Sequence, residues 1–164
     1  MSVLNVSRLI LLSLWLGAAV YFSAVVAPAA FSVLRSFELP NASEIAGGIV
    51  TRSLSVVNVS GFIVGIVVLL TLFAARGARS RSSLLVETIC ASLMIISTGV
   101  GHWIIAARMR ALRAAMTLPI DQVPPSDARR IAFNSLHVYS VNALTLAMIA
   151  ALVAIVVIAW KGRG

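Results

Sequence analysis

The chain has 164 residues, of which 60% are hydrophobic and only 11% are charged, and its mean hydropathy is +1.04. A soluble domain carries about 25% charged residues, so this composition excludes a soluble globular protein. The formal net charge of +8 does not indicate nucleic-acid binding, because the arginines flank apolar runs and form no basic face with interleaved aromatic residues.

Four runs without Asp, Glu, Lys or Arg follow one another along the chain, at residues 9–34, 53–75, 88–107 and 131–160. About 20 helical residues cross a hydrocarbon core of roughly 30 Å, so each run is long enough to span a membrane. The first run is too long for the apolar core of a secretory signal, and we expect it to be a helix of the folded protein. The predicted fold class is therefore all-α: an integral membrane four-helix bundle, antiparallel and up-down-up-down. It forms a single transmembrane domain over residues 1–164, with helices at about 5–35, 53–76, 84–116 and 126–161.

The third linker, residues 108–130, is the only connection between helices that is long enough to hold structure of its own. Residues 106–116 are strong helix formers, so the third helix should continue beyond the lipid until Pro119 approaches. Ser126 is the expected N-cap of the fourth helix, and residues 119–125 should form a short exposed turn.

The polar side chains within the apolar runs gather in one leaflet. Asn58, His102 and His137 each lie six or seven residues inside a flanking arginine, which is roughly 9–10 Å at 1.5 Å per residue. Chain reversal places these three arginines on the same side of the membrane. The predicted polar intramembrane pocket comprises Asn58, Thr98, His102, Asn134, His137, Tyr139, Ser140 and Asn142. The opposite leaflet reads as nearly pure Leu, Ile, Val and Ala.

Several interpretations of this pocket stay open. Polar side chains often hydrogen-bond between membrane helices as packing contacts, and Gly61 and Gly65 have the small-xxx-small spacing of close helix approach. Alternatively, His102 and His137 are a sufficient pair for a bis-histidine haem b, although we expect first of all that no cofactor binds. If any metal is bound, these two residues are its ligands, but no carboxylate lies at their depth to complete a zinc site. A path for a proton or small solute is the third interpretation.

Recognisable enzyme motifs are missing. There is no nucleophile elbow, phosphate-binding glycine loop, HExxH or carboxylate pair, so we expect no enzymatic activity and no catalytic residue. Glu87 is expected to be an interfacial residue near a helix N-terminus, without a chemical role. Cys90 is the only cysteine, which excludes an internal disulfide.

Four short patterns carry a family resemblance: Trp15-x-Gly17, Pro28-x-x-Phe31, a segment over residues 108–113, and Phe133-x-x-Leu136-His137-x-x-Ser140. They resemble the transmembrane-protein-205-like family, whose bacterial branch is a four-helix membrane domain of unknown function. This resemblance implies a membrane protein without an established activity, placed in the bacterial inner (plasma) membrane.

The positive charges decide orientation weakly, with six on the side of the termini and seven on the other. We expect both termini to be cytoplasmic, because the linker between the second and third helices is short and purely basic. The partners expected are the lipid bilayer, a second copy of the chain or a larger membrane complex, and no nucleic acid. The leading hypothesis is a structural, interaction or accessory component of the membrane.

Overall fold

The computed structural model describes residues 2–74 and 81–161. The first span consists of α1 (Val3–Tyr21), the π-helical segment η1 (Phe22–Val26) and α2 (Ala27–Ser36). The second is α3 (Ala42–Ala74), and the third is α4 (Arg81–Gly99), the π-helical segment η3 (Val100–Ile105) and α5 (Ala106–Ala114). The fourth is α6 (Ala128–Lys161). Within these ranges the structure has no β-strand.

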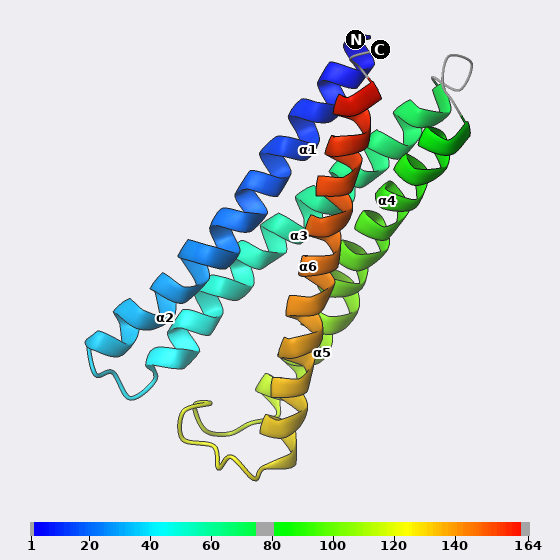
Figure 1. Ribbon diagram of the computed structural model, residues 1–164. Helices are drawn as coiled ribbons and strands as arrows, with labels where there is room; N and C mark the ends of the chain where they lie inside the picture. The colour runs from blue at the N-terminus through cyan, green and yellow to red at the C-terminus, as the bar shows by residue number, and fades with distance from the viewer. Residues whose placement is uncertain (1, 75–80, 162–164) are drawn as a thin grey trace.

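Four helical spans in the described ranges are long and apolar enough to cross a membrane: Val3–Ser36, Ala42–Ala74, Arg81–Ala114 and Ala128–Trp160. Successive spans run in opposite directions, so α1 begins at the end of the bundle where α6 finishes (Figure 1). The predicted all-α, up-down-up-down membrane bundle is thereby confirmed. A helix of 33 or 34 residues is about 50 Å long, so each span exceeds a hydrocarbon core of roughly 30 Å.

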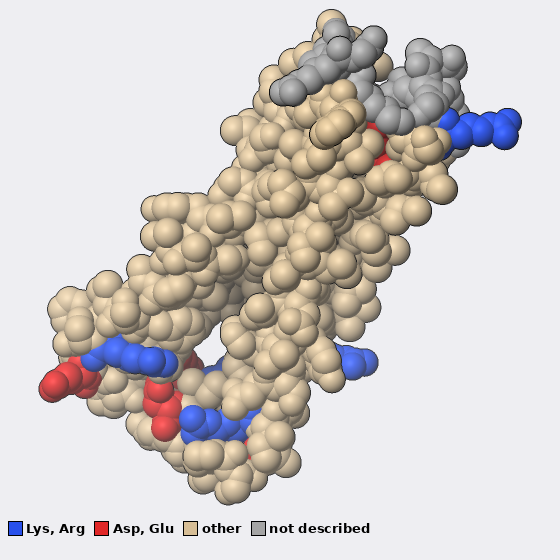
Figure 2. All heavy atoms as spheres, in the orientation of Figure 1, with Lys and Arg blue, Asp and Glu red and all other residues tan. Residues whose placement is uncertain are grey.

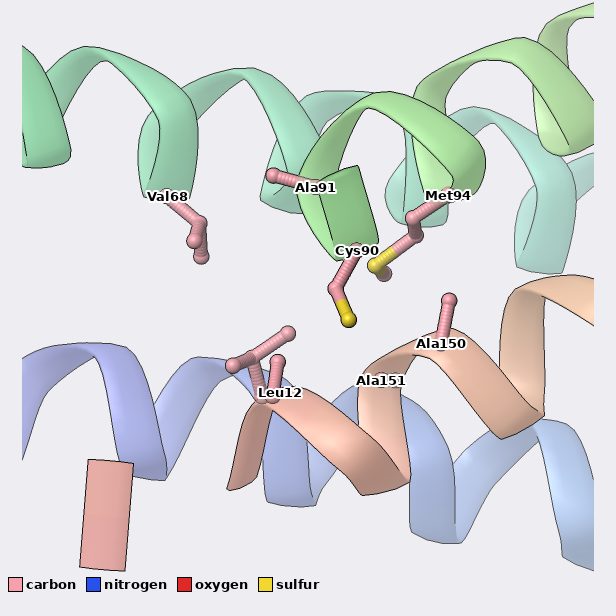
Figure 3. Close-up of a pocket in the computed structure, with 8 residues that line it drawn as sticks. Leu12, Val68, Cys90, Ala91, Met94, Ala150 and Ala151 are labelled. Atoms are coloured by element: carbon pink, nitrogen blue, oxygen red, sulfur yellow. The ribbon is translucent and has the colours of Figure 1, made fainter. Parts of the chain in front are cut away.

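The buried residues of each span repeat at alternating spacings of three and four, the pattern of knobs-into-holes packing. The buried stripe of α1 is Arg8, Leu12, Trp15 and Ala19, and that of α6 is Ser140, Leu144, Ala147, Ala151, Ala154 and Ile158. Small residues dominate the α6 stripe, which lets α6 approach α4 closely. The four spans meet around Leu12, Val68, Cys90 and Met94, where the interior is apolar and has no room for a water molecule (Figure 3).

The bundle is closed at one end and open at the other. α1 packs against α3 and α6, and α4 packs against the same two helices. Further along, α2 stays against α3 and α5 stays against α6, while α2 and α6 share no appreciable contact. The two helix pairs therefore diverge toward the linkers at residues 37–41 and 115–127 (Figure 1). We call this part the open half, and the part containing the chain ends the closed half.

Helix boundaries differ from the expected ones mainly at α3, which starts at Ala42 rather than near residue 53. The expectation stopped the helix at Arg52, but a charged residue ends only the lipid-facing part of a helix, not the helix itself. At α6, Asp127 is the capping residue instead of Ser126, because its Oδ1 accepts the backbone N–H of Arg129 at 2.8 Å. The linker before it is not simply an exposed turn, since Met116 and Val123 are buried.

Two π-helical turns interrupt the long spans, both in the open half. In η1 the amide of Ala27 bonds to the carbonyl of Phe22, one residue further back than in an α-helix. Pro28 follows, lacks an N–H and crowds the carbonyl four residues earlier, and a wider turn relieves that clash. In η3 the amide of Ala106 bonds to Gly101 in the same way. Each turn adds one residue and changes the face that the rest of its helix presents.

Candidate polar site in the open half

Three of the eight predicted pocket residues are buried: Asn58, Thr98 and Ser140. Thr98 donates its hydroxyl to the carbonyl of Met94 at 2.7 Å, within its own helix. Asn58 of α3 lies against Gly101 of η3, where an added Cβ would be 3.2 Å from the amide nitrogen of Asn58. A side chain at position 101 would therefore press on the Asn58 amide, and the glycine gives that amide its room.

His102 is half-buried and faces α3. Its Nδ1 lies 3.4 Å from the hydroxyl oxygen of Ser55, and its ring meets the ring of Trp103 edge-on at 4.9 Å. Trp103 in turn packs edge-to-face on Phe62 of α3, with ring centroids 4.8 Å apart. The imidazole therefore contacts α3 directly through Ser55, while its neighbour Trp103 packs on Phe62 of the same helix. Neither Ser55 nor Phe62 was among the predicted site residues.

His137 is exposed even though its register places it on the buried face of α6. It lies seven residues before Leu144, and Ala151 and Ile158 follow Leu144 at successive intervals of seven; all three of those residues are buried. Positions seven apart in a helix share one face. His137 is exposed because α2, which would cover it in a closed bundle, packs on α3 instead. Figure 2 shows the resulting hollow between the surface over α2 and α3 and the surface over α6.

The other three predicted residues, Asn134, Tyr139 and Asn142, are also exposed. They lie on other faces of α6 from that of the buried stripe. The structure therefore brings Asn58, Thr98, His102 and Ser140 into the helix interfaces, leaves His137 at the edge of the hollow and directs the remaining three outward. Sequence depth alone did not separate these groups, because depth says nothing about which way a side chain points.

At the rim, the free end of the open half, α5 and the linker over residues 115–127 contact the start of α3. Arg113 of α5 forms a 2.7 Å ion pair with Glu44 of α3, and the carboxylate of Asp121 accepts the backbone N–H of Ser43 at 3.2 Å. Four apolar side chains in these segments are also buried: Ala42, Ala46, Met116 and Val123. The linker thus covers the end of the hollow, while the side of the hollow stays open (Figure 2).

A charged pair at the start of α6 completes this rim. The guanidinium of Arg129 lies 2.7 Å from the carboxylate of Asp127 and donates to the carbonyl of Ala115 at the same distance. The hydrogen bonds from Arg129 hold the pKa of Asp127 at about 2, below its usual value of 3.8. The start of α6 is in this way tied to the end of α5.

The closed half contains two buried charged residues that sequence reasoning missed. Arg8 is 1% exposed and Glu87 is 2% exposed. The Nε of Arg8 donates to the hydroxyl of Thr71 at 2.8 Å, and a second guanidinium nitrogen bonds to the carbonyl of Thr71. The interfacial position expected for Glu87 stays a prediction, but its burial between helices was not expected. The signal was present in the spacing, because Arg8 precedes Leu12 by four residues and Trp15 by seven.

Gly61 and Gly65 are occupied by contacts within the chain. A Cβ at Gly61 would lie 2.7 Å from the indole of Trp15, and one at Gly65 would lie 2.7 Å from Ile95. The Nε1 of Trp15 donates to the carbonyl of Val57 at 2.9 Å, which fixes the ring over Gly61. This glycine pair joins α3 to α1 and α4, so it offers no surface for association with another chain.

Metal-ligating side chains do not cluster in the described ranges, where no group of three or more His, Cys, Asp or Glu is placed to hold an ion. His102 faces Ser55 on α3, whereas His137 lies on α6 at the hollow. What the site offers chemically is a set of hydrogen-bonding side chains beside a hollow that is open at its side (Figure 2).

Comparison with known proteins adds a family without a described activity. No curated protein and no solved structure showed a significant match to the chain. A family model described as a domain of unknown function, DUF4149, matches residues 10–117, from the first turns of α1 to the residues just after α5. The match covers well over half of the chain and ends before α6. This integral membrane protein therefore belongs to the DUF4149 family.

Proposed function

We propose that this protein is a non-enzymatic membrane component that accommodates an amphipathic guest molecule from the surrounding leaflet in its open half. The observation that carries the proposal is the exposure of His137 at a position that the register of α6 assigns to the bundle interior. A helix that leaves its core-facing side uncovered creates a space that lipid, rather than water, reaches first.

The chemistry of the hollow suits a molecule with one polar group and an apolar chain. His137 supplies an imidazole, which can both donate and accept hydrogen bonds, about one third of the way into the bilayer. Residues 146–159 of α6 offer only apolar side chains. Basic residues outnumber acidic ones at the rim, with Arg35, Arg52, Arg108 and Arg110 beyond those already paired. An anionic head group therefore fits better than a cationic one.

The proposal is an interaction role and includes no reaction, in keeping with the lack of an acid-base or nucleophile arrangement among the described side chains. We also propose that the protein is related to the transmembrane-protein-205-like family. Its support is the set of sequence patterns, of which the Leu136-His137-x-x-Ser140 segment lies outside the matched range. We further propose that the protein lies in a bacterial inner membrane with both termini in the cytoplasm.

Photo-crosslinking of the purified protein tests the role directly. A phosphatidylglycerol carrying a photoreactive acyl chain should label residues 132–144 in a manner that unlabelled phosphatidylglycerol saturates at a few equivalents. Lipid that merely surrounds the protein labels all outer faces and does not saturate. His137→Leu should weaken the saturable labelling by about tenfold, in line with the ~1.5 kcal/mol of a single buried hydrogen bond.

Tyr139→Phe is the matched control, because it removes a polar group at similar depth from another exposed face of α6. It should leave the labelling unchanged. Labelling that is uniform over the outer faces, or equal in wild type and His137→Leu, contradicts a binding role for the hollow.

A further inference from the structure

We propose that the outer face of α6 is the interface of a parallel homodimer, in which Asn142 of one copy hydrogen-bonds to Asn142 of the second copy near the middle of the membrane. This inference concerns a surface on another side of α6 from the hollow and does not depend on the proposed function.

The outer face of α6 carries a second stripe with alternating spacings of three and four residues. It consists of Ile131, Ser135, Val138, Asn142, Thr145, Ile149, Leu152 and Val156. All eight are exposed, and this outer stripe lies opposite the buried stripe that starts at Ser140. The chain therefore covers one face of α6 and leaves the face that carries the outer stripe exposed.

Asn142 is the unusual member of the outer stripe. It follows Arg130 by twelve residues, or roughly 18 Å, which places it near the centre of a hydrocarbon core about 30 Å thick. Its carboxamide makes no hydrogen bond to any residue of the described ranges. An unsatisfied amide in hydrocarbon costs several kcal/mol, so a stable position there requires a partner with both a donor and an acceptor.

A second copy of the chain meets this requirement by symmetry. Copies inserted in the same orientation are related by a two-fold axis along the membrane normal, and such an axis brings residues of equal depth together. Asn142 then faces its own equivalent, and a carboxamide is self-complementary because it has both a carbonyl oxygen and an NH2 group.

The neighbours of Asn142 in the outer stripe agree with a two-stranded parallel contact. Ile149 and Val156 share its heptad position, and the alternate position holds Val138, Thr145 and Leu152. In a two-stranded parallel coiled coil, a single Asn among β-branched residues at the first position fixes register and oligomeric state. No comparable amide faces outward elsewhere, because Asn58 is buried and the remaining Asn and Gln residues lie near or beyond the ends of the spans.

Disulfide trapping in membranes tests the surface. With Cys90 replaced by Ala, Ile149→Cys on the outer stripe should give a crosslinked dimer on mild oxidation. Leu146 is exposed on the same helix but lies about a quarter turn from the centre of the outer stripe, so Leu146→Cys should give little dimer. Equal trapping at both positions reflects random collision and overturns the assigned face.

Sedimentation in mild detergent tests the role of Asn142. Wild type should be dimeric, and Asn142→Leu should lower the association constant about three- to thirtyfold, the range measured for hydrogen bonds between membrane helices. Asn142→Gln should retain most of the association, and Asn134→Leu, which removes an exposed amide nearer the rim, should retain all of it. A monomeric wild type, or an Asn142→Leu variant as dimeric as wild type, overturns the proposal.

Discussion

Replacing Gly61 by Ala should destabilise the bundle, although alanine is the better helix former. The new Cβ would lie 2.7 Å from three atoms of the Trp15 indole, closer than real Cβ contacts occur. The ring cannot simply swing away, because Trp15 is buried and its Nε1 is bonded to the carbonyl of Val57. Overpacking of this kind costs about 1–3 kcal/mol, and loss of the indole hydrogen bond would add about 1 kcal/mol.

Gly17→Ala provides a matched control, because nothing lies within 4 Å of a Cβ at that position. This substitution should be neutral or stabilise the protein by up to about 1 kcal/mol through helix propensity. Unfolding is conveniently followed by a thiol-reactive fluorophore, since Cys90 is buried and is the only cysteine. Gly61→Ala should lower the unfolding midpoint by several degrees, while Gly17→Ala should not.

A double substitution shows whether the cost arises at the indole. In a Trp15→Phe background the smaller ring leaves room, so Gly61→Ala should cost clearly less than it does in the wild type. If Gly61→Ala unfolds at the wild-type midpoint, or costs the same with Phe at position 15, then the contact between Trp15 and Gly61 does not limit helix approach.

Three further predictions concern the charged and ionisable groups. Arg8→Lys should destabilise the protein by about 1.5–3 kcal/mol, because an ammonium group cannot reproduce the forked contact with Thr71, and thermal unfolding compared with the exposed Arg81→Lys measures it. The pKa of Asp127 is depressed in the folded protein, so the stability that Asp127 contributes to the start of α6 is fully present above pH 3.8 and is lost as the pH falls through about 2. Hydrogen exchange of the Arg129 amide, measured against pH, should follow this course. Loss of protection near pH 5 would contradict it. The purified protein should show no Soret band, because His102 is engaged with Ser55 while His137 lies on another helix at the hollow, and a bis-histidine haem spectrum would refute this arrangement.

The spans and their order followed from the sequence because lipid imposes a simple rule: a charge-free run of sufficient length must be a helix. The start of α3 did not follow, since the helix continues through Arg52 to Ala42 and a charged residue does not end a helix. The burial of Arg8 agrees with its spacing to Leu12 and Trp15, but a lone arginine before an apolar run is more typical of a head-group anchor.

The sequence predicts a common depth in the bilayer for Asn58, His102 and His137, and that depth stays a prediction. Counting residues from an arginine does not reveal that His102 faces Ser55 or that His137 is exposed. The direction of His102 depends on how η3 packs on α3, and the exposure of His137 depends on how α2 and α6 diverge. Pro28 hints at the π-helical turn η1, whereas η3 has no comparable single-residue signal beyond its glycines.

The two π-helical turns give the bundle separately adjustable halves. A regular helix transmits any rotation along its whole length, because each residue is fixed at about 100° from the last. One extra residue in η1 and another in η3 break that continuity, so the faces of α2 and α5 are offset from those of α1 and α4. The closed half can keep its interlocked register while the open half is aimed independently. The orientation of the helices around the hollow therefore depends on two local insertions rather than on the register of the closed half.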